Sequence, residues 1–176
     1  MGWKKFQQHF QIEHIVHIID NNLCIGSPYS SILVSIDMSS GTIKPNQVSP
    51  DFLQKYYPNI LTTPASELID LLAAPDQFSN STNVYTYNDG IILEKLCENT
   101  NYPNVTHDGI LMYENTFSTD KNKVVGWAKR NAELLHQNFL ERIEDTERNL
   151  KNLKKKAQMF KDIKDNLEEK YPDVKI

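Results

Sequence analysis

The pattern of hydrophobic and polar positions changes near residue 118. Before it, apolar residues form short runs rich in β-branched side chains, at Ile12–Ile19, Leu23–Gly26 and Ile32–Ile36. Such runs, separated by turn residues, favour short antiparallel strands. After it, no proline interrupts residues 121–170. The chain is therefore expected to be an α+β protein, with a small antiparallel-sheet head and a long C-terminal, coiled-coil-like helix.

Two short helices are expected within the head. Ser49-Pro50-Asp51 is typical of a helix start, with a serine N-cap, proline at the first helical position and an acidic residue near the positive end of the dipole. Pro58 should end that helix. Thr63-Pro64 repeats the start signal, and Pro75 ends the second helix. The segment Trp3–Phe10 also has helical spacing of its aromatic residues.

Two hairpins are expected in the second half of the head. Asn88-Asp89-Gly90 and His107-Asp108-Gly109 each separate two apolar runs. Asn, Asp and Gly tolerate the positive φ angles that tight hairpin turns require. The head is assigned residues 1–117, and the remaining residues 118–176 form a separate oligomerisation or docking segment.

The long helix is expected at about residues 119–170, capped by Ser118 or Thr119 with Asp120 in its first turn. Its apolar positions recur every three or four residues, and we call this set the seam. A step of four from Phe139 to Ile143, where three is due, is a stutter. The seam comprises Ala128, Ala132, Leu135, Phe139, Ile143, Thr146, Leu150, Leu153, Ala157, Phe160, Ile163 and Leu167, the last two with less regular spacing, and Tyr171 continues it.

The seam predicts self-association into a homo-oligomer. Its main contacts are expected from Leu135, Phe139, Ile143, Leu150, Leu153, Phe160 and Leu167. A helical hairpin, or a helix folded back on the head, is the alternative. Because Thr146 and the alanines weaken an isolated dimer, tetramers and contacts assisted by the head also remain open.

The net charge of the chain limits the kinds of partner that it is expected to bind. The formal net charge is −4, which argues against a general nucleic-acid binder. The basic stretch around Lys154–Lys156 is interpreted as a solvated flank of the helix. No apolar run approaches the roughly 20 residues of a membrane span. The N-terminus lacks the apolar core of a signal peptide, so a cytoplasmic location is expected.

Few residues are candidates for catalysis or for binding a ligand. His107 and Asp108 are weak catalytic candidates for a hydrolase, because no nucleophile accompanies them. Tyr85, Tyr87 and Tyr113, together with His107, are candidates for binding a partner or ligand, since tyrosine suits both protein interfaces and stacking. No catalytic residue is assigned.

No metal or cofactor is expected either. Cys24 and Cys97 lack zinc-type spacing. His14 and His17 share a face on a helix, but they point to opposite faces of the strand that we favour for this segment. A P-loop and a GxGxxG motif are both absent from the sequence.

Three segments resemble uncharacterised small non-structural proteins of tailed bacteriophages. They are MGWKKFQQHF at the start, VTHDGILMYENTFSTDK from Val105, and VVGWAKRNA from Val124. The resemblance implies the cytoplasm of an infected bacterium and a host component as partner, but it transfers no site residue.

The leading hypothesis is therefore a non-enzymatic, oligomeric binding protein, a phage accessory factor that binds and inhibits a host defence protein. The alternative is a protein that binds or sequesters a small ligand, such as a nucleotide, in a pocket of the head. A hydrolase that uses His107 and Asp108 ranks third.

Overall fold

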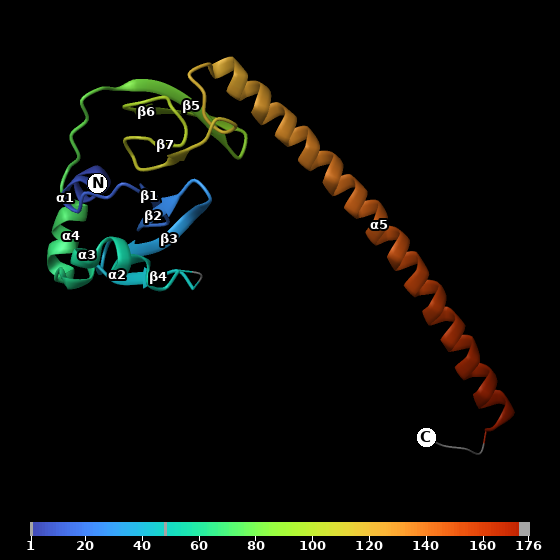
Figure 1. The fold of residues 1–176 in the computed structure, drawn as a ribbon. Helices are drawn as coiled ribbons and strands as arrows, with labels where there is room; N and C mark the ends of the chain where they lie inside the picture. The colour runs from blue at the N-terminus through green and yellow to red at the C-terminus, as the bar shows by residue number, and fades with distance from the viewer. Residues whose placement is uncertain (1, 48, 173–176) are drawn as a thin grey trace. The chain divides into compact units, whose positions relative to one another are not determined.

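The structure is a computed structural model that describes residues 2–47 and 49–172 of the chain (Figure 1). It has the expected α+β composition, with small antiparallel sheets, short helices and one long C-terminal helix. Contacts divide the chain into two units, residues 1–128 and 129–176. The elements are α1 (Trp3–His9), β1 (Ile15–Ile19), β2 (Asn22–Ser27), β3 (Ser30–Asp37), β4 (Ile43–Pro45), α2 (Phe52–Tyr56), α3 (Pro58–Thr62), α4 (Ala65–Ala73), β5 (Thr82–Asn88), β6 (Ile91–Cys97), β7 (Asn104–Val105), β8 (Leu111–Met112) and α5 (Lys121–Lys170).

Strands β1 to β4 form an antiparallel sheet in sequence order. Alternation along β3 buries Val34 and Ile36, which pack with residues of β1 and β2. Figure 1 shows the four short helices of the head gathered beside this sheet. Their buried side chains complete the main core, which contains Trp3, Phe6, Ile12, Val16, Leu23, Ile25, Val34, Ile36, Phe52, Leu53, Ile60, Leu68, Leu72 and Val105.

The first strand starts later than the sequence predicted. β1 begins at Ile15 instead of Ile12. After α1 ends at His9, Gln11 has a φ of 52°, and the Ile12 amide donates to the Gln7 carbonyl at 2.9 Å. This left-handed helix end uses the residues that the apolar run had assigned to the strand.

The helices of the head differ from the sequence prediction in their number and in the residues at which they begin. The sequence predicted α1, α2 and α4 but not α3. Helix α2 begins at Phe52, after Asp51, rather than at Pro50. Pro58 follows α2 as predicted and also occupies the first position of α3, where its missing N–H costs nothing.

Both predicted hairpin turns are confirmed. Asp89 and Gly90 have φ angles of 48° and 78°, and they join β5 to β6 in an antiparallel pair. Gly109 has a φ of 87° in the turn between β7 and β8. These strands cover a second, smaller core of Val84, Cys97, Met112 and Phe117.

Helix α5 begins at Lys121, two residues later than expected. Asp120 caps it, because its Oδ1 accepts the amides of Asn122 at 2.8 Å and Lys123 at 3.3 Å. The amide of Asp120 in turn donates to the Ser118 hydroxyl at 3.1 Å. The predicted cap at Ser118 or Thr119 therefore moves to Asp120, and Ser118 supports it.

Candidate partner-binding surface

The largest exposed apolar surface lies along α5. Every residue from 129 to 172 is exposed, including the apolar ones. The seven main seam residues have between 51% and 64% of their surface exposed. Monomeric proteins seldom expose a continuous apolar surface of this length, so it indicates a binding surface.

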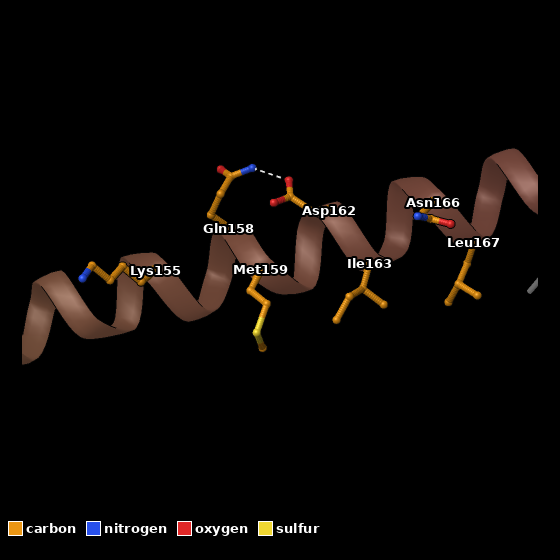
Figure 2. A pocket seen from close by; sticks show the side chains of 7 residues that line it. All are labelled: Lys155, Gln158, Met159, Asp162, Ile163, Asn166 and Leu167. Atoms are coloured by element: carbon orange, nitrogen blue, oxygen red, sulfur yellow. Dashed lines mark hydrogen bonds between the residues drawn. The ribbon is translucent and has the colours of Figure 1, made fainter.

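The seam is wider than its spacing predicted. Leu134, Leu140 and Met159 are also exposed and lie one residue away from seam positions. Figure 2 shows Met159, Ile163 and Leu167 pointing to the same side of α5, while Gln158 and Asp162 bond to each other elsewhere on the helix at 2.7 Å. These apolar side chains border an open stretch of the helix surface together with Lys155, Gln158, Asp162 and Asn166.

Some polar side chains on α5 bond to neighbours one helical turn away. Arg148 contacts Glu144 at 3.3 Å and Asp145 at 3.2 Å. On the seam itself, the Thr146 hydroxyl donates to the Arg142 carbonyl at 2.6 Å. This internal hydrogen bond lets the polar Thr146 enter an apolar contact without losing a partner.

In the head, His107 is held by packing and by its backbone. Its ring stacks on Phe78 with the centroids 3.7 Å apart and an interplanar angle of 6°. Its carbonyl accepts the Trp3 indole N–H at 3.0 Å, and its amide donates to the Leu96 carbonyl at 2.7 Å. Its buried Nε2 has no hydrogen-bond partner among the described residues.

Asp108 does not orient His107. Its two carboxylate oxygens accept from Lys95 and from the Thr106 hydroxyl, each at 2.5 Å. Burial would raise the pKa of Asp108, but these hydrogen bonds outweigh it, and the pKa lies below its ordinary value. The two catalytic candidates are therefore neighbours in sequence whose side chains belong to separate sets of contacts.

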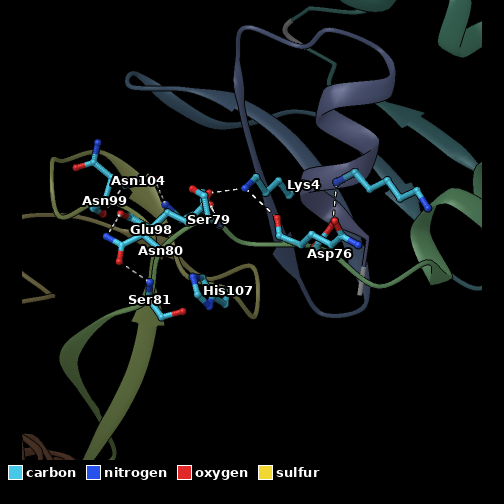
Figure 3. A network of polar contacts seen from close by, with 12 residues as sticks. Lys4, Asp76, Ser79, Asn80, Ser81, Glu98, Asn99, Asn104 and His107 are labelled. Atoms are coloured by element: carbon cyan, nitrogen blue, oxygen red, sulfur yellow. Dashed lines mark hydrogen bonds and ion pairs between the residues drawn. The ribbon is translucent and has the colours of Figure 1, made fainter.

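A polar cluster beside His107 ties the N-terminal helix to the second half of the head (Figure 3). Lys4 pairs with Glu98 at 2.6 Å, and Glu98 also accepts the amide and hydroxyl of Ser79 at 2.6 and 2.9 Å. Burial would raise the pKa of Glu98, but the bonds from Lys4 and Ser79 lower it to about 2. Sequence spacing could not reveal this cluster, because its members lie far apart along the chain.

Two of the candidate tyrosines share one face. Tyr85 and Tyr87 alternate with the buried Val84 and Thr86, so both point to the outer face of the β5–β6 hairpin. Lys121 lies over the Tyr85 ring at 5.8 Å. The pairing register places Ile92 opposite Tyr87, Glu94 opposite Tyr85, and Leu96 opposite Asn83 on this surface. We call its apolar and aromatic members, Tyr85, Tyr87, Ile92 and Leu96, the hairpin face.

The other two candidates lie elsewhere. Tyr113 lines an open pocket of about 540 Å³ with Tyr102 and Trp127. His107 lines a different pocket of about 510 Å³, together with Asn83, Glu94 and the Lys95–Asp108 pair. The Asn83 amide donates to Glu94 at 2.6 Å. Since most polar groups of this second pocket are already paired, few are free for a ligand.

His14, which precedes β1, and His17 and Cys24 of the main sheet are held by packing and hydrogen bonds. His14 shares a 2.6 Å hydrogen bond with the Tyr57 hydroxyl, and buried His17 bonds to the Ser31 carbonyl at 2.8 Å. Burial lowers the pKa of His17 and raises that of the Cys24 thiol to about 11. Within residues 2–47 and 49–172, no three His, Cys, Asp or Glu side chains are grouped for a metal ion.

Comparison with protein-family models, with curated proteins and with solved structures found no match to this chain. Among the described helices, none is long and apolar enough to span a membrane.

Proposed function

We propose that this chain is a non-enzymatic binding protein that self-associates through α5 and holds a second protein with its head. The exposed seam carries this proposal, because the forty residues from Ala128 to Leu167 have a seam position, apolar except at Thr146, at every third or fourth residue. Its mean step of about 3.55 residues lies between a heptad repeat and a straight helix, so the seam stays on one side of α5.

The hairpin face is the head surface that best suits a protein partner. Leu96 is 42% exposed, and the two tyrosines beside it offer both apolar area and a hydroxyl. Tyrosine is enriched at the energetically important centres of interfaces. The absence of a bond between His107 and Asp108, among the contacts of the described residues, favours binding over hydrolysis.

The resemblance of three segments to phage proteins supports a biological setting. In that setting the protein acts in the cytoplasm of an infected bacterium and inhibits a host defence protein by occupying it. Self-association then presents more than one head to the same target.

Self-association is tested by placing charges on the seam. The double variant Leu150→Asp and Leu153→Asp should weaken assembly at least about 100-fold, because two half-buried leucines per chain are lost and charges are desolvated. Analytical ultracentrifugation measures the dissociation constant. The matched control, Asn149→Asp and Asn152→Asp, adds the same charges one residue away from the seam and should weaken assembly much less. Equal effects of the two pairs would refute a role of the seam.

The head surface is tested by native mass spectrometry of the full chain purified from bacterial cells. A stoichiometric host protein is expected with the unchanged chain and lost with Tyr87→Ala. Tyr29→Ala is the control, since Tyr29 is fully exposed elsewhere in the head. Retention of the host protein by Tyr87→Ala would move the binding surface away from the hairpin face.

A further inference from the structure

Charge along α5 is segregated into four blocks of alternating sign. Residues 121–130 hold four basic and no acidic side chains, and residues 131–147 hold five acidic and one basic. Residues 148–161 hold six basic and no acidic side chains, and residues 162–170 hold four acidic and two basic. From residue 129 onward these side chains are exposed, so the blocks form the outer surface of the helix.

This block pattern discriminates between parallel and antiparallel pairs. In a parallel, in-register pair each block faces its own copy, and like charges meet along the whole helix. In an antiparallel pair centred near Arg148, the acidic block 131–147 faces the basic block 148–161 of the second copy. Residues 126–130 of the first basic block likewise face residues 166–170 of the last acidic block. Opposite signs then meet over most of the two central blocks and over part of the two outer ones.

The spacing of the seam selects the same arrangement independently. Outward from Thr146 the steps toward the N-terminus are 3, 4, 4, 3 and 4, and outward from Leu150 toward the C-terminus they are 3, 4, 3, 3 and 4. The seam is therefore nearly a mirror image of itself about Arg148. A two-fold antiparallel pair requires such symmetry, whereas a parallel pair does not.

The sizes of the facing seam residues also favour the antiparallel pair. Reversal about Arg148 places three seam pairs directly opposite each other: Thr146 with Leu150, Ile143 with Leu153, and Phe139 with Ala157. It brings three more to within one residue of each other: Leu135 with Phe160, Ala132 with Ile163, and Ala128 with Leu167. Each alanine thus faces a large side chain. A parallel pair places every alanine against its own copy, which leaves gaps in the contact.

We infer that the occupant of the seam is a second copy of this chain, paired antiparallel along α5 with the two-fold axis at Arg148. This inference rests on the proposed self-association and adds its direction, its register and its copy number.

Spin-label distances test the inference on the full chain. Labels on Asp165→Cys and Lys155→Cys lie 17 and 7 residues from the axis, so the antiparallel pair gives distances of about 50 Å and about 20 Å between copies. A parallel pair gives one short distance, under about 25 Å, at both positions. Because Cys24 and Cys97 are buried, the unsubstituted chain serves as the unlabelled control.

The possible outcomes distinguish the proposed self-association through α5 from the inferred antiparallel pairing. Two chains per particle by ultracentrifugation, with one long and one short distance, support the inference. Two chains with short distances at both positions overturn the antiparallel direction and leave self-association standing. A monomer overturns both proposals, and an assembly of more than two chains overturns the paired arrangement alone.

Discussion

Phe78 and Glu98 show how single residues hold the head together. The Phe78 ring stacks on His107, and the Lys4 ammonium lies 5.1 Å from its centroid. Glu98 anchors the same lysine. These contacts join α1 to segments more than seventy residues away, so the N-terminus is fixed by side chains as well as by the main core.

Replacing Glu98 with Gln should lower the free energy of unfolding by about 1 kcal/mol at pH 7, since a partly exposed, charge-assisted bond is lost. The pKa of Glu98 falls from an ordinary 4.5 to about 2 on folding. The stabilisation is therefore complete above about pH 4.5 and disappears as the pH falls to about 2. Urea unfolding of the unchanged chain and of Glu98→Gln at pH 7 and pH 3 measures this difference in the free energy of unfolding. The same difference at both pH values would contradict the prediction.

Two turn glycines offer a matched comparison. Gly90 and Gly109 both have positive φ, but a Cβ at Gly90 meets nothing within 4 Å, whereas at Gly109 it lies 2.6 Å from Ile18. Gly90→Ala should cost about 1–2 kcal/mol for backbone strain alone. Gly109→Ala should cost at least about 1 kcal/mol more, because Ile18 must move. Thermal unfolding measures the stability of both variants. Equal losses of stability would contradict the close contact between position 109 and Ile18.

At the scale of elements, the sequence predicted those turns and helices whose formation depends on residues close together in the chain. Asn88-Asp89-Gly90 predicted its hairpin, and the helical pattern predicted the end of α5 at Lys170 and its start to within two residues. The start of β1 was missed because the left-handed end of α1 takes residues from an apolar run. Apolarity alone does not distinguish a strand from a buried helix end.

The surroundings of the candidate site were less predictable. His107 was singled out from the sequence, but its contacts with Trp3 and Phe78 lie 104 and 29 positions away. Pairing of Asp108 with Lys95 depends on how β6 lies beside the turn. Such contacts follow from tertiary packing, for which spacing in a single sequence carries no signal.

The cap of α5 yields a prediction for this element. Asp120→Ala should cost about 1 kcal/mol of helix stability, because the amides of Asn122 and Lys123 lose their acceptor. Hydrogen exchange should then become faster across the first turn of α5. Asp120→Asn keeps a side-chain oxygen and should exchange like the unchanged chain. Unaltered exchange in Asp120→Ala would show that the cap is dispensable.

At the scale of the whole molecule, the alternating charge blocks predict how assembly responds to salt. An antiparallel pair joins opposite signs, so screening weakens it. The dissociation constant should rise about tenfold between 50 and 500 mM NaCl, as measured by ultracentrifugation. A parallel pair joins like signs and should tighten instead, so the sign of the slope distinguishes the two arrangements without any substitution.

The uninterrupted length of α5 has a consequence for target choice. In the antiparallel pair, the two Lys121 residues lie about 80 Å apart, since each is 27 residues from the axis. A helix without proline keeps that separation nearly constant. In such a pair, two heads gain avidity on a target that carries several sites, because the second attachment occurs at a high effective concentration. Isolated copies of the same target would be held only by the affinity of one head.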